Sequence, residues 1–221
     1  MALDPVTYNE IFSFCSKENA VLVAVSKTKP VSEILELYQL GQRDFGENYV
    51  QELVEKQALL PADIRWHFIG HLQSNKVKYI APFVHLVHGV DSLKLLKEIN
   101  KQAAKCNRVV DVLLQVHIAR EETKFGLDED ELIGILHSAE LKALNHVRLC
   151  GLMGMASFSG DKNLIRGEFK SLKNIFDKAA SIEGENCQMS ILSMGMSSDY
   201  ALAIEEGSNM VRVGSLIFGA R

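Results

Sequence analysis

The stretch VLVAVSKTKP (residues 21–30) begins with five apolar residues, and two lysines follow shortly after them. A short apolar run that ends at turn residues is typical of a buried strand. In the segment after it, Ser32 is placed to cap a helix, and Ile34 and Leu37 share one helical face. The opening of the chain therefore predicts a strand and then a helix, with two cations between them.

The same alternation of strand and helix patterns continues along the chain. Further strands are expected at residues 43–46, 65–69, 84–88, 109–118, 147–153, 188–193 and 210–213. Between them, helices are expected at residues 48–58, 92–106, 128–138, 164–181 and 199–206. Eight such strands in 221 residues favour an α/β fold, a single-domain (β/α)8 TIM barrel over residues 1–221. An open, doubly wound parallel sheet is the alternative.

Too few residues follow the last predicted strand to form a helix of ordinary length. Only residues 214–221 follow the last predicted strand. An additional helix is predicted before the first strand, at residues 6–18. We therefore expect this N-terminal helix to cover the part of the barrel that an eighth helix would otherwise cover.

The composition is that of an ordinary globular protein, with 47% hydrophobic and 24% charged residues. A formal net charge of −4 argues against a nucleic-acid or anionic-membrane surface. The four cysteines are far apart in the sequence, which indicates free thiols in a reducing compartment. No basic and apolar leader and no apolar run of membrane-spanning length is present. A cytoplasmic monomer is the expected form.

In a barrel of this kind the ligand site lies at the carboxyl ends of the strands. In an extended strand Lys27 points to the same side as Val23 and Val25. Its amine is therefore expected at the top of the barrel interior. Partial loss of solvent, with Lys29 and Lys124 as neighbours, disfavours the charged form. A neutral amine is a nucleophile that forms a Schiff base with a carbonyl compound. The alternatives are that Lys27 extends into water or pairs with Glu47.

The ends of the last two strands are rich in glycine and serine. The sequence SMGMSSDY (193–200) follows one strand, and RVGSLIFG (212–219) contains the end of the other. Glycine admits phosphate oxygens close to the backbone, and barrels often bind phosphate after these two strands. We expect a phosphate site here, with Gly214 and Ser215 in it. The alternative is that these are plain loops, with Ser198 as a helix cap.

Two more polar residues stand at strand ends. Alternate residues of a strand face the same side, so Arg212 faces the same side as Gly214. A guanidinium that points into the barrel needs a buried acceptor, such as a heteroaromatic ring nitrogen of a ligand. The alternative is a surface arginine. Asn48 is placed to contact a ligand, or to form a capping box with Gln51.

The histidines give no indication of a metal site. His67 and His71 are four residues apart, but Gly70 interrupts the segment and no cysteine or carboxylate joins them. His85 and His88 flank a strand end and are expected to be structural. No Ser-His-Asp order and no pair of glycosidase-like carboxylates is evident.

Six segments together carry a family resemblance, which spans residues 21–221. They are VLVAVSKTKP, GQRDFGENYVQE, WHFIGHLQSNK, KFG, GLMGMAS and SMGMSSDYALAIEEGSNMVRVGSLIFGAR. The chain resembles the pyridoxal phosphate homeostasis proteins of the YggS/PROSC type. This resemblance implies a barrel similar to the N-terminal domain of alanine racemase, which binds pyridoxal 5'-phosphate (PLP) as its cofactor.

The resemblance also implies roles for individual residues. Lys27 would carry the Schiff base, and Arg212 would face the pyridine nitrogen. The phosphate would be held by Ser197, Gly214 and Ser215. Asn48 would be a further cofactor contact. Lys29 and Lys124 match basic residues near the site, which suit secondary contacts with PLP during its transfer.

Arginine has donors only and does not stabilise a protonated pyridine ring as a carboxylate would, so the cofactor is a weaker electron sink. The tyrosine that completes the acid–base pair of alanine racemase belongs to a second domain, which is not expected in a chain that stops at Arg221.

The expected function is therefore intracellular PLP homeostasis: a non-catalytic carrier that delivers PLP to apo-enzymes. One alternative is a small PLP-dependent racemase or lyase that uses Lys124, His71 or Tyr49 for proton transfer. A class I aldolase-type barrel is a more remote one.

Overall fold

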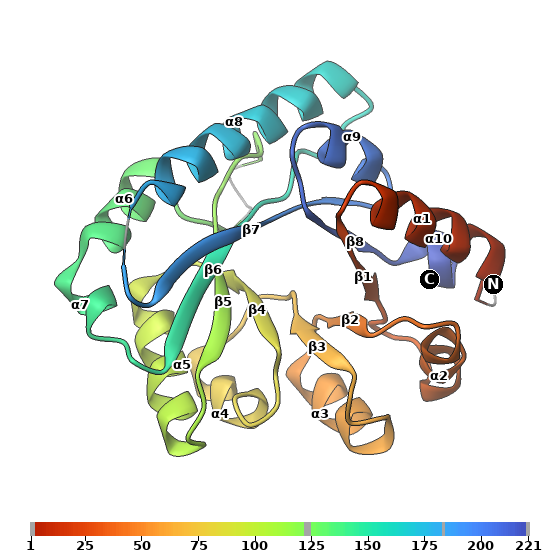
Figure 1. The fold of residues 1–221 in the computed structure, drawn as a ribbon, viewed down its shortest axis with the longest axis horizontal. Coiled ribbons are helices and arrows are strands. Elements are labelled where there is room, and N and C mark those ends of the chain that lie inside the picture. Colours follow the sequence, from red (N-terminus) through yellow and green to blue (C-terminus); the bar gives the residue numbers. More distant parts are fainter. Residues whose placement is uncertain (1–2, 122–124, 183, 220–221) are drawn as a thin grey trace.

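The structure, a computed structural model, describes residues 3–121, 125–182 and 184–219. In this part of the chain, eight parallel strands follow one another around a closed barrel, and β8 pairs with β1 (Figure 1). The strands are β1 (Val21–Val25), β2 (Asp44–Glu47), β3 (Arg65–Phe68), β4 (Leu86–Val90), β5 (Val110–Gln115), β6 (Val147–Met153), β7 (Cys187–Met196) and β8 (Met210–Val213). The predicted (β/α)8 barrel is confirmed.

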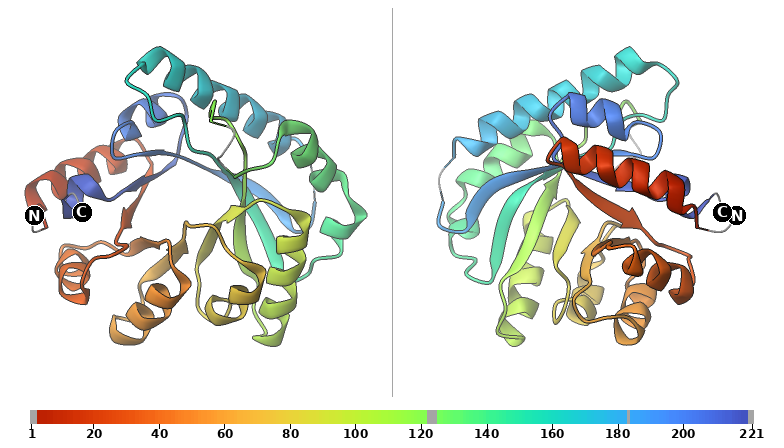
Figure 2. Two further views of the ribbon diagram at one scale, coloured as in Figure 1. Left: turned by 180° about the vertical axis from the view of Figure 1, so that it is seen from behind. Right: turned by 45° about the vertical axis from the view of Figure 1, so that its right-hand side comes forward.

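Helices surround the barrel on the outside (Figures 1 and 2). They are α1 (Pro5–Lys17), α2 (Val31–Gln39), α3 (Val50–Leu59), the 3-10 turn η1 (Ser74–Lys76), α4 (Val77–Ile80), α5 (Leu93–Lys105), α6 (Glu129–His137), α7 (Ala139–Lys142), α8 (Lys162–Ala180), α9 (Tyr200–Glu205) and α10 (Ser215–Phe218). The sequence patterns did not predict α4, α7 or α10. Each of these has only four residues, too few to display a helical period.

Side-chain caps explain where some helices begin and correct one expectation. The carboxylate of Asp161 accepts hydrogen bonds from Asn163 N and Leu164 N at the start of α8. By contrast, the predicted cap at Ser32 is wrong. Helix α2 begins at Val31, and its N-cap is the extended residue Pro30, two positions before the predicted cap.

Helix α1 covers the barrel between its first and last strands. Tyr8, Ile11 and Cys15 form its buried face, and α1 lies beside α10 in both views of Figure 2. The N–H of Asp4 donates to the carbonyl of Ile217 at 2.9 Å, which joins the start of α1 to α10. The expectation that the N-terminal helix takes the place of a full eighth helix is confirmed.

The apolar residues form two separate cores. The larger one lies between the strands and the helices and includes Leu22 and Ala24 of β1. The smaller one lies on the inner side of the barrel wall and contains Val23, Leu86, Leu113, Cys150, Met153 and Met210. Side chains along β1 therefore alternate as predicted, with Val23 inside the barrel.

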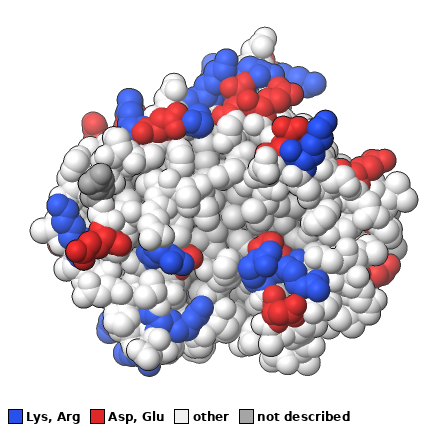
Figure 3. All heavy atoms as spheres, viewed as in Figure 1, with Lys and Arg blue, Asp and Glu red and all other residues white. Residues whose placement is uncertain are grey.

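The surface carries acidic and basic groups in mixed clusters. On the face seen in Figure 3, Lys and Arg atoms lie beside Asp and Glu atoms around a largely uncharged centre. The four cysteines are all free thiols. In the described ranges, none of the helices combines the length and the apolar character needed to cross a membrane.

Candidate functional site

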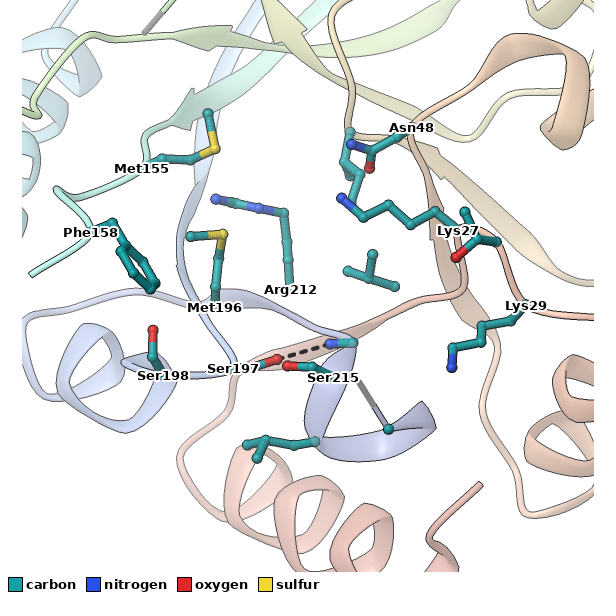
Figure 4. A pocket seen from close by; sticks show the side chains of 16 residues that line it. Lys27, Lys29, Asn48, Met155, Phe158, Met196, Ser197, Ser198, Arg212 and Ser215 are labelled. Atoms are coloured by element: carbon teal, nitrogen blue, oxygen red, sulfur yellow. Dashed lines mark hydrogen bonds between the residues drawn. The ribbon is translucent and has the colours of Figure 1, made fainter. Parts of the chain in front are cut away.

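A cavity of about 590 Å³ lies at the carboxyl ends of the strands, within the usual size range for a small-molecule site (Figure 4). Its polar lining comprises Lys27, Thr28, Lys29, Asn48, Ser197, Ser198, Arg212 and Ser215. The residues predicted to contact PLP, Gly214 included, therefore line one cavity as far as the structure describes them. His71 and Tyr49, named for proton transfer in the racemase alternative, are not among the described residues that line it. Lys124 lies outside the described residues.

Lys27 enters the cavity from the end of β1. Its side chain is half-buried and extends inward, toward the space that Arg212 also enters (Figure 4). The backbone of the next residue, Thr28, is in the left-handed region at φ 63°, which is uncommon for a β-branched residue. The N–H of Thr28 donates to Glu52 Oε1 at 2.6 Å, which stabilises this turn. Lys27 is thus fixed at the point where the chain turns sharply away from β1.

The neighbouring lysine has a different environment. The ammonium group of Lys29 donates to the carbonyl of Phe218 at 2.6 Å, at the carboxyl end of α10. Cations are favourable at that end of a helix because its last carbonyls lack partners within the helix. Lys29 thus links the loop after β1 to the segment after β8, at the edge of the cavity.

A buried ion pair supports the loop that carries Lys27. Glu47 Oε1 accepts from Ser26 Oγ at 2.5 Å and from Lys56 Nζ at 2.8 Å, and Lys56 Nζ also donates to the carbonyl of Ser26 at 2.7 Å. Burial raises the pKa of Glu47, and Lys56 opposes that shift. Lys56, which no sequence pattern identified, is therefore the cation that pairs with Glu47.

Arg212 is buried, with 4% of its surface exposed, which contradicts the alternative of a surface arginine. Its guanidinium donates to the carbonyl and the hydroxyl of Ser193, at 2.9 and 2.6 Å, and to the carbonyl of Gly154 at 3.0 Å. Burial lowers the pKa of Arg212 to about 10, so the group stays charged at neutral pH. A guanidinium has five N–H donors, so Arg212 can also donate to an acceptor in the cavity.

The segments after β7 and β8 meet at the lower edge of the cavity in Figure 4. The N–H of Gly214 donates to Ser197 Oγ at 3.2 Å. A Cβ at position 214 would lie 3.0 Å from the carbonyl oxygen of Val25, so glycine lets β8 approach β1 closely here. Ser215 begins α10, whose first N–H groups lack partners within the helix. This cluster of small residues and N–H and O–H donors suits an anionic group.

The alternative reading of Ser198 as a helix cap is wrong. The N-cap of α9 is Asp199, and its carboxylate accepts from Met196 N at 2.7 Å rather than from the helix. Ser198 Oγ donates to Asp199 Oδ2 at 3.1 Å and lines the cavity. The serines after β7 are therefore part of the cavity wall.

Asn48 contacts the cavity and does not cap a helix. The N-cap of α3 is Tyr49, without a side-chain hydrogen bond, so the capping box with Gln51 is wrong. Asn48 Oδ1 is buried and has no hydrogen-bond partner among the described residues. A buried acceptor of this kind is costly unless a ligand or water satisfies it. Asn48 is therefore suited to bind a donor group in the cavity.

Sequence reasoning missed the apolar walls of the cavity. Met155 and Met196 line it after β6 and at the end of β7, and Phe158 lies at its edge with 94% of its surface exposed. Of their two motifs, SMGMSSDY was singled out for its glycine and serines, and GLMGMAS only as a segment of the family resemblance. The methionines in them were the available signal, because flexible apolar side chains often line ligand sites.

A family model and individual relatives identify the family of this chain. A family model described as the N-terminal domain of alanine racemase matches residues 8–221. The pyridoxal phosphate homeostasis protein of Aquifex aeolicus is 42% identical over 205 residues, which cover 91% of this chain and 87% of that protein. The chain belongs to the pyridoxal phosphate homeostasis protein family. The human member of this family is 41% identical over 215 residues, covering 90% of this chain and 76% of that protein.

A solved structure extends the comparison to three dimensions. PipY of Synechococcus elongatus, solved with PLP bound, superimposes with a TM-score of 0.85 at 34% identity. The match covers 96% of this chain and all of that chain, 100%. Membership of the pyridoxal phosphate homeostasis protein family therefore rests on both sequence and fold.

Proposed function

We propose that residues 1–221 form one PLP-binding unit that holds the cofactor in this cavity and releases it to other proteins. The observation that carries the proposal is that Lys27 and Arg212, from opposite ends of the sequence, enter one cavity from the adjacent strands β1 and β8. A PLP-bound relative of the same fold supports the choice of ligand.

The described residues fit the parts of this cofactor. When bound, PLP supplies an aldehyde that condenses reversibly with an amine, releasing water, and a phosphate that needs hydrogen-bond donors. Lys27 is the amine for the aldehyde, and the guanidinium of Arg212 donates toward the ring nitrogen. The donors for the phosphate are Ser197 Oγ and the backbone at Gly214 and Ser215.

Holding PLP suits these residues better than turning over a substrate. Because the charged guanidinium of Arg212 donates hydrogen bonds, it favours an unprotonated ring nitrogen and does not strengthen the ring as an electron sink. Asn48 is a further contact, through its buried oxygen. We infer that Lys29 and Lys124 are secondary contacts during transfer to apo-enzymes. A cytoplasmic monomer is the form that we propose for the carrier.

Trapping the bound cofactor tests the proposal. The purified protein mixed with PLP should gain a visible absorption band, and borohydride reduction followed by peptide mapping should place the label on Lys27. Lys27→Ala should lose both. Lys97→Ala serves as the control, because Lys97 pairs with Glu140 on the surface and should leave both unchanged. Absence of the band, or a label on another lysine, contradicts the proposal.

A second experiment separates a carrier from the alternative racemase or lyase. The loaded protein is incubated with single enantiomers of amino acids, and the optical rotation is followed. We expect no change, together with recovery of activity when the loaded protein is mixed with a PLP-dependent apo-enzyme. A steady change of rotation that is lost in Lys27→Ala would establish the enzymatic alternative instead.

A further inference from the structure

A chain of buried hydrogen bonds runs from Arg212 across the interior of the barrel to the opposite end. The hydroxyl of Ser193 contacts Arg212 at 2.6 Å and His88 Nδ1 at 3.2 Å. His88 Nε2 lies 2.9 Å from His67 Nδ1, and His67 Nε2 lies 3.0 Å from Asp44 Oδ1. The side chains of Ser193, His88 and His67 are at most 1% exposed. Four strands, β2, β3, β4 and β7, thus supply a continuous path to the cavity.

The donors along this path must all point the same way when both histidines are neutral. Arg212 donates to Ser193, so the hydroxyl proton of Ser193 is free to be donated to His88 Nδ1. His88 then carries its proton on Nε2 and donates to His67 Nδ1. His67 in turn carries its proton on Nε2 and donates to the carboxylate of Asp44. Every bond of the path is satisfied by this one arrangement.

One added proton reverses the donor direction of two of the four hydrogen bonds in the path. A protonated His67 donates from both ring nitrogens, to Asp44 and to His88 Nε2. His88 then carries its proton on Nδ1 and donates to Ser193 Oγ. The oxygen of Ser193 now receives N–H donors from both His88 and Arg212, and its own proton must turn to another acceptor. Protonation at one end of the barrel therefore changes the hydrogen bonding of Arg212 at the other.

Burial and contacts distinguish the two histidines of the path. Burial, together with the charges of His67 and Arg212, lowers the pKa of His88 well below its ordinary value, so His88 stays neutral. His67 faces the carboxylate of Asp44, whose own charge is partly compensated by a bidentate pair with Arg65.

The remaining titratable groups near the pair lie at the same end of the barrel. His85, before β4, packs against the ring of His67 at 5.4 Å between centroids, and burial lowers its pKa. Asp111 of β5 acts on His85 through its charge and pairs with Arg148 of β6.

We propose that Asp44, His67, His88 and Ser193 are positioning residues for Arg212, and that they couple its hydrogen bonds in the cavity to protonation of His67. Arg212 is the group that faces the ring nitrogen in the proposed function, and the significance of the coupling for PLP rests on that function. The coupling itself is a property of the ligand-free protein. Through it, the acidity at the far end of the barrel sets how Arg212 donates to a bound ring.

Nuclear magnetic resonance on the ligand-free, 15N-labelled protein tests the coupling. The ring nitrogens of His67 and His88 and the Nε–H of Arg212 are followed between about pH 8 and pH 5, where histidines titrate. The resonance of Arg212 is expected to shift with the same midpoint as His67, while the shifts of His88 report an exchange of the protonated nitrogen. An Arg212 resonance that stays constant while His67 titrates would overturn the proposal.

We call the coupling of Arg212 to His67 through His88 and Ser193 the relay. Two substitutions distinguish it from a general effect of pH on Arg212. Glutamine keeps a polar side chain but takes up no proton, so His67→Gln should abolish the shift of Arg212. His146→Gln is the matched control, because His146 is a partly buried histidine bonded to the carbonyl of Arg108, outside the path. It should leave the shift intact. A shift that persists in His67→Gln contradicts the relay, and if that variant fails to fold, His88→Gln and the wild-type titration decide.

Measuring PLP binding over the same pH range keeps the two proposals apart. If Lys27 binds PLP but Arg212 does not follow His67, the relay alone is wrong. If Arg212 follows His67 but no PLP binds, the proposed function is wrong and the relay stands.

Discussion

Thr28 stands between the two lysines of the cavity with its backbone in a conformation that costs free energy for any residue with a Cβ. Its φ of 63° belongs to the left-handed region, where L-residues lose about 1–2 kcal/mol. Strain of this kind persists only where the surroundings enforce it, and it is common at ligand sites. The bond from Thr28 N to Glu52 is one such constraint. The turn directs Lys27 into the cavity and Lys29 toward α10.

Substitutions at Thr28 measure this strain. Thr28→Gly should be more stable than Thr28→Ala by about 1 kcal/mol, because only alanine retains a Cβ in the left-handed region. At an ordinary position the order is reversed, since glycine loses more backbone entropy on folding. Urea unfolding of the two variants gives the difference directly. An alanine variant more stable than the glycine variant would show that the backbone there is not strained.

At the scale of the elements, β6 and β7 approach each other closely at Gly151. The register of the two strands shifts between Leu149 and Gly151. A Cβ on Gly151 would lie 1.8 Å from the carbonyl oxygen of Ile191, which is backbone and has no freedom to rotate away. β7 continues from this point to Ser193 and Met196, so the strand spacing here bears on the cavity.

Two glycine-to-alanine substitutions test this contact. Gly151→Ala should lower the free energy of unfolding by more than about 4 kcal/mol, because β6 and β7 must separate to admit the methyl group. Gly167→Ala, in α8, is the control. A Cβ there meets nothing within 4 Å, and alanine is the better helix former by about 1 kcal/mol, so this variant should gain stability. Chemical denaturation compares them. Equal stabilities would contradict the close contact.

The sequence predicted the presence of the strands better than the positions of their ends. The strands were visible as apolar runs bounded by polar residues, yet their ends were less certain. β4 begins two residues later than predicted, at Leu86, and β7 extends three residues further, to Met196. Hydrogen bonds with neighbouring strands set these limits, and a single strand's sequence does not contain that information.

For the whole molecule, α1 is the element that completes the outer layer of helices. Ile11 is 2% exposed on its inner face, whereas Val6 of the same helix is 68% exposed. Ile11→Ala should therefore lower the free energy of unfolding by about 3 kcal/mol through the cavity it leaves. Val6→Ala should change it by less than about 0.5 kcal/mol. Thermal or urea unfolding measures both. Similar small losses would indicate that α1 is only loosely packed on the barrel.

The sequence allowed the barrel and the polar residues at strand ends to be predicted, because both depend on local patterns. Lys27, Arg212 and Gly214 were identified from their positions after or within single strands. The path from Arg212 to Asp44 was not, and His88 was expected to be simply structural. With Arg212 of β8 included, its members come from five strands and meet only when the register of the closed barrel aligns them. Single-sequence patterns carry no information about that alignment.

The pairing of β1 with β8 has a consequence for the nascent chain. During synthesis Lys27 leaves the ribosome long before Arg212 and Gly214 do. The cavity therefore cannot form until β8 has emerged, because this strand both closes the barrel wall and brings Arg212 into the cavity. A polypeptide that ended before β8 would carry Lys27 but would lack the part of the cavity wall that Arg212, Gly214 and Ser215 supply.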